Sequence, residues 1–242
     1  MKATNYKDKK IVSKYLKKTL SGVYIIYPAI LRLLRNVKGK TVLDLGCGAG
    51  LISQKLSERG AKVFAVDSSQ RWIDICKKES NKTKNIKYTV ADADDLSIYK
   101  DRKFDIVFAN MVFLSVSSKQ KVAKSFNEVS RIIKKGGTFI FSDCHPVANM
   151  TGSSSTKISG AVPGFSYFKD GAKYRGTYLL SDYSHIEFTD LHFSLGFYSK
   201  LLNENGFMIE EIIEPKPAKM DPEKRFKNYR IPEYIIFKCR KL

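Results

Sequence analysis

The stretch Thr41-Val-Leu-Asp-Leu-Gly-Cys-Gly-Ala-Gly50 constrains the fold of this 242-residue chain more than any other. A short apolar run ends in three glycines spaced G-x-G-x-G, and residues 51–59 then place apolar side chains at helical spacing up to Gly60. Glycines at such a turn allow positive φ and let the backbone approach a bound ligand closely. The pattern predicts a strand, a tight turn that can cradle a ligand, and a helix.

Units of the same kind follow along the chain. Four further runs have the length and apolar character of strands, at 61–66, 86–90, 104–109 and 138–142. Between them, helical spacing covers 70–79 and 119–133. Strands that alternate with helices of about 10–15 residues imply right-handed crossovers and a parallel sheet with helices on both faces. We therefore predict a doubly wound α/β fold.

The two ends of the chain differ from this core. Amphipathic helical spacing covers residues 1–20 and 24–34. After Cys144-His-Pro146 the alternation breaks into a long connection rich in Gly, Ser, Pro and Tyr, with one possible hairpin around Lys169-Asp-Gly171. A long irregular connection inside a compact domain is typical of a lid or binding loop. A helix at 195–205 and strands at 207–213 and 234–239 complete the prediction, and these last two strands can pair antiparallel at the sheet edge.

Composition excludes several classes of protein. With 43% hydrophobic and 28% charged residues, the chain is neither disordered nor collagenous nor a disulfide scaffold. The net charge of +19 comes mostly from the ends, since residues 1–40 carry +10 and residues 216–242 carry +6. Such ends could attract nucleic acid, an anionic membrane or an acidic partner. Lysine outnumbers arginine 33 to 10, whereas phosphate recognition favours the planar arginine fork, so plain solvated charge is the favoured interpretation.

The cysteines and the apolar segments favour a reducing cytoplasm. Cys47, Cys76, Cys144 and Cys239 are scattered without metal-ligand spacing, so we expect neither a disulfide framework nor a bound metal. The lysine-rich start is not followed by a signal-type apolar run. The most apolar stretch, residues 23–34, is shorter than the roughly 20 apolar residues that span a bilayer, and we expect no membrane association.

Ligands of open α/β sheets bind outside the carboxyl ends of the strands, so the residues that follow each strand are the candidates. Asp44 precedes the glycine turn, and Leu51 stands where a dinucleotide fingerprint has its third glycine. An acidic residue there would repel a pyrophosphate but can receive the positive amino group of an amino acid. This favours a ligand with an adenosine at one end and an amino acid at the other.

Three more residues fit such a ligand. Asp67 ends the second strand and can accept hydrogen bonds from both ribose hydroxyls. Asp92 follows the third strand and can accept from the adenine amine, and Trp72 can cover the adenine face. Each has a structural alternative: Asp67 as a helix cap, Asp92 as a turn cap, and Trp72 as a core residue. The ordered set, with carboxylates at successive strand ends, favours binding.

These residues carry a resemblance. Residues 41–50 resemble the first motif of the class I S-adenosylmethionine-dependent methyltransferases. Val66-Asp67, Ala91-Asp92-Ala93 and the segment 104–110 are similar to its later motifs in the right order, so the resemblance covers about 38–145. Segments 141–146, 190–195 and 201–207 are similar to the small-molecule branch called methyltransferase type 11. The chain departs from the pattern in carrying Trp72, where methionine is common, and in its lysine-heavy N-terminus.

The resemblance implies a mostly parallel seven-stranded sheet with an antiparallel C-terminal edge hairpin and a substrate-capping insertion. It implies one methyltransferase domain over 1–242, made of an N-terminal helical lid (1–37), a donor-binding core (38–145), a substrate cap (146–191) and a C-terminal helix with the strand hairpin (192–242). It also implies S-adenosylmethionine as methyl donor, with S-adenosylhomocysteine as product. The residues expected to bind it are Asp44, Gly46, Cys47, Gly48, Asp67, Ser68, Trp72, Asp92, Ala93 and Asn110.

Candidates for contact with the methyl acceptor come from the second half of the chain. Histidine is well suited to remove a proton near neutral pH, so we expect His145 and His192 to serve as catalytic residues, with His185 less favoured. A packing role is the alternative for each. Aromatic residues of the irregular segment suit a cap over an apolar acceptor or a satellite core: Phe165, Tyr167, Phe168, Tyr174, Tyr178 and Tyr183. Tyr6 and Tyr15 are candidates for the N-terminal lid.

Four functions compete at this point. We favour methyl transfer to a small organic acceptor at O, N or C by in-line displacement. An RNA acceptor is motivated by the basic ends, but Asn110 is followed by Met-Val-Phe and not by the proline-aromatic platform of base methylation. A donor-binding protein without catalysis is the third, and an NAD-dependent oxidoreductase, disfavoured by Leu51, is the fourth. The sequence leaves the acceptor and the oligomeric state open.

Overall fold

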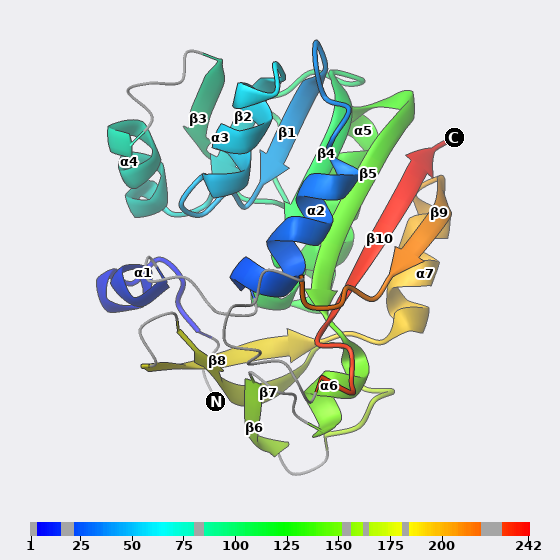
Figure 1. Ribbon diagram of the computed structural model, residues 1–242. Helices are drawn as coiled ribbons and strands as arrows, with labels where there is room; N and C mark the ends of the chain where they lie inside the picture. Colours follow the sequence, from blue (N-terminus) through cyan, green and yellow to red (C-terminus); the bar gives the residue numbers. More distant parts are fainter. Residues whose placement is uncertain are drawn as a thin grey trace.

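Seven strands form one sheet in the order β3-β2-β1-β4-β5-β10-β9 in the computed structural model (Figure 1). The structure describes residues 4–15, 22–79, 85–151, 156–161, 165–180, 184–218 and 229–242. The strands of this sheet are β1 (Thr41–Leu45), β2 (Lys62–Asp67), β3 (Ile86–Val90), β4 (Phe104–Asn110), β5 (Ile133–Cys144), β9 (Phe207–Ile213) and β10 (Tyr234–Lys241). The order reverses beside β1, so the carboxyl ends of β1 and β4 flank the switch point where ligands of such sheets bind.

Strand direction agrees with the prediction. β1 to β5 pair in parallel, whereas β10 pairs antiparallel with both β5 and β9. Phe237 of β10 stands between Phe141 of β5 and Ile212 of β9 in the register. The doubly wound fold with an antiparallel edge hairpin is thus confirmed.

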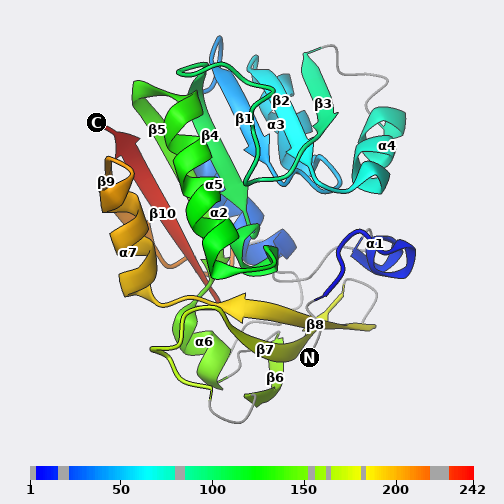
Figure 2. The ribbon, with the colours of Figure 1, turned by 180° about the vertical axis from the view of Figure 1, so that it is seen from behind.

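Helices cover both faces of the sheet (Figures 1 and 2). α2 (Tyr27–Leu33) and α3 (Leu51–Glu58) pack on one face, and α5 (Lys119–Ile132) and α7 (Leu195–Glu204) pack on the other. Their apolar stripes are buried against β-branched and aromatic strand residues, as amphipathic helices require. The other helical elements of this part of the chain are the π-helical turn η1 (Gly22–Ile26), α4 (Gln70–Glu79) and the 3₁₀ turn η2 (Phe113–Ser115). Among the described residues, no helix has both the length and the apolar character required to cross a bilayer.

The segment expected to be irregular contains a second sheet. After α6 (Pro146–Thr151), three antiparallel strands follow in the order β6-β7-β8: β6 (Thr156–Ala161), β7 (Ala172–Leu179) and β8 (His185–His192). Tyr174 and Tyr178 lie on the same face of β7, and both are buried against Phe188 of β8. A hairpin was predicted around Lys169-Asp-Gly171. This segment lies at the end of the connection between β6 and β7, and these two strands pair antiparallel. This insertion sheet, β6 to β8, lies beyond the carboxyl ends of the parallel strands (Figure 1).

The N-terminal segment, residues 4–15, is attached to the insertion sheet. The Thr4 amide donates to the Thr189 carbonyl at 3.0 Å, and the Thr189 amide donates to Thr4 Oγ1 at 2.6 Å. α1 (Lys9–Tyr15) follows and lies next to α4. Residues 16–20 of the predicted N-terminal helical stretch, and Tyr183 of the predicted aromatic cluster, lie outside the described residues.

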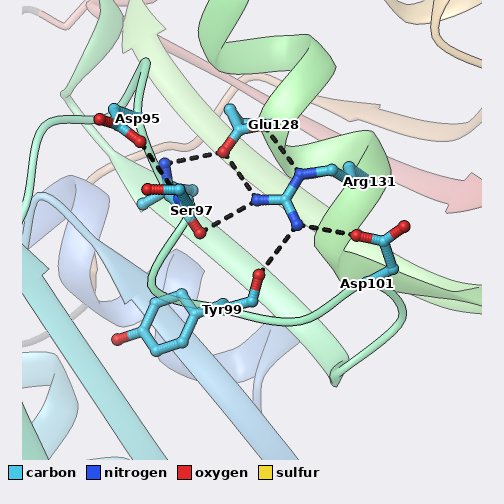
Figure 3. Close-up of polar contacts among 7 residues, drawn as sticks. Asp95, Ser97, Tyr99, Asp101, Glu128 and Arg131 are labelled. Carbon is cyan, nitrogen blue, oxygen red and sulfur yellow. Dashed lines mark hydrogen bonds and ion pairs between the residues drawn. The ribbon is translucent and has the colours of Figure 1, made fainter.

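A guanidinium holds the loop that follows β3 (Figure 3). Arg131 of α5 donates to the Leu96 and Tyr99 carbonyls at 3.0 and 2.9 Å and to Asp101 at 2.8 Å. Glu128 receives two bonds from the same guanidinium and one from the Leu96 amide. Bidentate charged bonds of this kind are strong and directional, so α5 fixes the loop that begins with Asp92 and Ala93.

Candidate functional site

One cavity of about 740 Å³ lies at the carboxyl edge of the parallel strands. Its walls come from the glycine turn, the ends of β2 and β4, the loop after β3, the N-terminal segment and the insertion sheet. All ten residues predicted to bind the donor line it: Asp44, Gly46, Cys47, Gly48, Asp67, Ser68, Trp72, Asp92, Ala93 and Asn110. The volume falls within the range of small-molecule sites.

The glycine turn can be made only by glycine at two positions. Gly46 has φ +72°, and a Cβ there would lie 2.5 Å from Val112 Cγ2. Gly50 has φ +71°, and a Cβ there would lie 2.9 Å from Cys76 Sγ. The amides of Gly46 and Cys47 both donate to the Val66 carbonyl, at 2.8 and 2.9 Å. The turn is therefore fixed against β2 and leaves its inner side open to a ligand.

Asp44 is a buried carboxyl beneath this turn. Ser53 of α3 donates to its Oδ2 at 2.5 Å. Burial raises the pKa of Asp44 to about 7, the Ser53 bond lowers it, and the neighbouring Asp67 raises it further. No cationic side chain of the described residues pairs with Asp44, so a ligand cation is the partner that would restore its charge.

Asp67 both shapes the turn and faces the cavity. Its Oδ2 accepts from the Gly48 amide and its Oδ1 from the Ser69 amide, each at 2.9 Å. The second bond lies just before α4, so Asp67 also supports the start of this helix, which was the structural alternative for it. Burial is the main reason that the pKa of Asp67 is raised, against the lowering effect of the two amides. Each carboxylate oxygen keeps a further lone pair for a ligand hydroxyl.

The remaining predicted residues form the two flanks of the cavity. Trp72 of α4 is only 7% exposed, so it serves the core and the cavity wall together. Asp92 faces solvent at the rim, where Lys7 lies 3.7 Å away. Asn110, at the end of β4, accepts from the Ser142 hydroxyl at 2.9 Å. Trp72 and Asp92 therefore mark the flank at β2 and β3, and Asn110 marks the flank at β4.

The structure places both predicted catalytic histidines outside the cavity lining. His192 is fully buried: its Nε2 donates to the Tyr167 carbonyl at 2.9 Å, and its Nδ1 accepts from Asn149 at 3.3 Å. His145 has its Nε2 3.0 Å from Glu214, and its Nδ1 accepts from the Val147 amide. Burial lowers the pKa of each. These contacts fit the packing role that was the alternative interpretation, while the catalytic role stays a prediction; His185 does not line the cavity either.

The flank near β4 and β5 is aromatic and apolar. Of the aromatic cluster proposed from the sequence, Tyr178 lines the cavity, whereas Tyr167 and Phe168 do not. Tyr6 and Tyr15 line it, as proposed for the N-terminal lid. Sequence reasoning missed several wall residues: Ile26, Tyr27, Met111, Val112, Leu114 and Tyr234. Met111 directly follows β4, and its φ of +58° could not be read from the sequence.

Comparisons with known proteins agree with this site. A family model described as "Methyltransferase domain" matches residues 43–141. Ubiquinone biosynthesis O-methyltransferase of Coxiella burnetii is 35% identical over 128 residues, which cover 51% of this chain and 53% of that protein. Cypemycin N-terminal methyltransferase of Streptomyces is 38% identical over 112 residues, covering 46% and 44%. The chain thus spans about half the length of the curated relatives it matches.

Fold similarity extends over more of the chain. A solved S-adenosylmethionine-dependent methyltransferase from Mesorhizobium loti superposes with a TM-score of 0.68 at 24% identity, covering 89% of this chain and 97% of that one. Together with the strand order, this shows that the chain has the fold of that methyltransferase, and residues 43–141 match a methyltransferase domain. The solved protein is by its name dependent on S-adenosylmethionine, the methyl donor that the sequence resemblance implies.

Proposed function

We propose that this chain transfers the methyl group of S-adenosylmethionine to a small organic acceptor. The observation that carries the proposal is the convergence of the strand-end residues on one cavity whose other flank is walled by aromatic side chains. The donor supplies an activated methyl group on a positive sulfur, so the chain's own contribution is to bind, to orient and to exclude water. Curated relatives act at different atoms by their names, one as an O-methyltransferase and one at an N-terminus.

The donor would be held along the strand ends in the order predicted from the sequence. Asp44 and the glycine turn would receive the amino acid part, and Asp67 would accept from the ribose hydroxyls. Trp72, Asp92 and Ala93 would surround the adenine. The fit rests on two features of this chain: a glycine turn in which a Cβ on Gly46 would clash with Val112, and the buried carboxyl of Asp44, which has no cationic partner among the described residues.

The acceptor flank favours an apolar or aromatic molecule without a negative charge. Tyr27, Leu114, Tyr178 and Tyr234 supply its walls. Of the three lysines that line the cavity, Lys7 and Lys121 are paired with Asp92 and Asp94, and Lys78 is the third. A phosphate backbone needs a series of free cations along its path, which one lysine does not supply, so the cavity supports a small acceptor over RNA. The cytoplasmic location remains the expectation drawn from the sequence.

Incubation with S-[methyl-³H]adenosylmethionine tests the proposal. A cell extract is first separated into organic-soluble metabolites, RNA and protein, and each fraction is offered to the purified chain. We expect label in the metabolite fraction and none when Gly46→Ala replaces the native chain. Label confined to RNA or protein would overturn the small acceptor. Failure to bind S-adenosylhomocysteine in calorimetry would overturn the activity itself.

A further inference from the structure

Two tyrosines link the acceptor flank of the cavity to a buried carboxyl. The Tyr15 hydroxyl donates to the Tyr6 hydroxyl at 3.4 Å, and Tyr6 donates to Asp190 Oδ1 at 2.7 Å. Both tyrosines line the cavity, whereas Asp190 on β8 is only 1% exposed and does not. The first bond is long for two hydroxyls, so it is the weaker of the two.

The direction of these bonds determines which kind of ligand group can form a hydrogen bond with Tyr15. Each phenol has a single proton. Tyr6 gives its proton to Asp190, so toward Tyr15 it can only accept. Tyr15 then gives its proton to Tyr6, and the remaining lone pair on its oxygen can only accept from a group in the cavity. A ligand that brings an O–H or N–H to Tyr15 completes the row, whereas one that brings a lone pair does not.

The surrounding structure holds the row in place. Two hydrogen bonds between Thr4 and Thr189 set Tyr6 opposite Asp190, the neighbour of Thr189 on β8. The rings of Tyr6 and Tyr15 pack edge to face with centroids 5.4 Å apart. Asp190 Oδ2 is buried and has no hydrogen-bond partner among the described residues. The carboxyl therefore keeps capacity to accept a proton.

The environment makes Asp190 a stronger base than an ordinary carboxylate. Burial raises its pKa to about 8, the Tyr6 bond lowers it, and the charge of Asp143 on β5 raises it. The other titratable groups around the row are Tyr27 of α2, Tyr174 and Tyr178 of β7 and Cys144 of β5, whose pKa values burial also raises. Near neutral pH these neighbours are uncharged, so Asp190 and Asp143 are the groups whose charge changes.

We propose that Tyr15 receives the proton of an O–H or N–H methyl acceptor and that the row through Tyr6 carries it to Asp190. The inference rests on the proposed methyl transfer. As the acceptor oxygen or nitrogen forms its bond to the methyl carbon, the methyl–sulfur bond breaks and its electron pair stays on sulfur. The acceptor proton moves to the Tyr15 oxygen, the Tyr15 proton to Tyr6, and the Tyr6 proton to the Asp190 carboxylate. Tyr15 is the catalytic residue of this row, and Tyr6 and Asp190 act through it.

Binding of matched probes tests the row in the full chain. With S-adenosylhomocysteine bound, the probes are small phenols and anilines, each compared with its O-methyl or N,N-dimethyl counterpart, which lacks the donated hydrogen. We expect the native chain to prefer the hydrogen-bearing member about 5-fold or more, and Tyr15→Phe to bind both members of a pair equally. Tyr99→Phe is the matched control, because it removes another buried hydroxyl away from the cavity and should keep the preference.

Turnover of the probes that bind separates proton transfer from packing. Tyr6→Phe should lower kcat about 10- to 1,000-fold with little change in KM. In the native chain kcat should rise with pH up to about 8, and Asp190→Asn should abolish that rise; if this variant does not fold, Tyr6→Phe alone decides. Equal binding of the pairs, their preference retained in Tyr15→Phe, or no probe bound beside S-adenosylhomocysteine would each overturn the row. Loss of S-adenosylhomocysteine binding in the native chain would instead overturn the proposed function.

Discussion

Ser53 donates a 2.5 Å hydrogen bond to Asp44 directly beneath the glycine turn, and this bond is the only side-chain support that holds the buried carboxyl among the described residues. A hydroxyl is a weak partner for a buried negative charge, so the site stays about evenly balanced between the acid and the carboxylate near neutral pH. A ligand with a positive charge shifts that balance.

Proton release on donor binding follows from Asp44. Since burial raises its pKa to about 7, a ligand ammonium beside it should lower the pKa and expel about half a proton at pH 7. Calorimetry with S-adenosylmethionine in buffers of different ionisation enthalpy measures the number. Affinity should rise with pH through about 7. Asp44→Asn is the control and should release none; a native chain that also releases none would contradict this role.

Gly46→Ala should weaken donor binding in a folded protein. The new Cβ would meet Val112 Cγ2 at 2.5 Å and would require a positive φ. We expect at least about 10-fold weaker binding of S-adenosylhomocysteine, since one lost contact of about 1.4 kcal/mol already gives that factor. Gly136→Ala separates the two effects, because Gly136 also has positive φ but its Cβ would meet nothing within 4 Å. Equal affinity loss in both variants would rule out the close contact as the cause.

Asp67→Ala should weaken donor binding by about 1–3 kcal/mol, because it removes charged acceptors for ligand hydroxyls. The variant also frees the Gly48 and Ser69 amides. Asp67→Asn keeps one acceptor oxygen and should lose less. Titration with S-adenosylhomocysteine gives both values, and native affinity in a folded Asp67→Ala variant would exclude Asp67 from the donor site.

Arg131→Ala should lower the free energy of unfolding by about 1.5–3 kcal/mol, since it breaks hydrogen bonds that a charged group makes to two carbonyls and two carboxylates. Urea unfolding measures the change. Lys200→Ala, which breaks an exposed pair with Glu204, should stay within about 0.5 kcal/mol. A similar small change in Arg131→Ala would mean that the loop after β3 is held by other contacts.

Stability should fall as pH rises from 7 to 9. Burial raises the pKa of Asp44 and Asp143 to about 7 and that of Asp190 to about 8, above their common unfolded value of 3.8. The folded chain then holds more protons than the unfolded chain, so the stabilisation is complete below about pH 4 and is lost as pH passes 7 to 8. We expect a loss of about 1–2 kcal/mol over this window. Urea unfolding of the native chain and of Asp190→Asn checks it, and the variant should show the smaller slope.

The strand ends could be predicted from the sequence because their signals are local. The apolar run before Gly46, the carboxylate of Asp67 and the helix from Gln70 each need only neighbouring residues to be recognised. The insertion sheet could not be predicted in the same way, because β8 is stabilised by pairing with β7 and by the stacking of Tyr178 on Phe188. His192 shows the same limit: the affinity of histidine for a proton near neutral pH suggested chemistry, but its partners Asn149 and Tyr167 come from distant segments.

The acceptor flank shows why function is harder to predict than fold. Tyr6 and Asp190 are 184 positions apart in the chain and meet only because Thr4 pairs with the edge of β8. No periodicity links them. The contact between Tyr6 and Asp190 can be recognised only in the folded structure, where the N-terminal segment lies along the insertion sheet.

β10 lies between β5 and β9 in the main sheet, although it follows every other strand in the sequence. During synthesis β1 to β5 can therefore pair before β10 emerges, while β9, which pairs with β10, has no partner strand in this sheet until then. The exposed backbone edge of β5 is a point of vulnerability to intermolecular pairing at that stage. Newly made chains should depend on folding assistance mainly until β9 and β10 dock together as a hairpin.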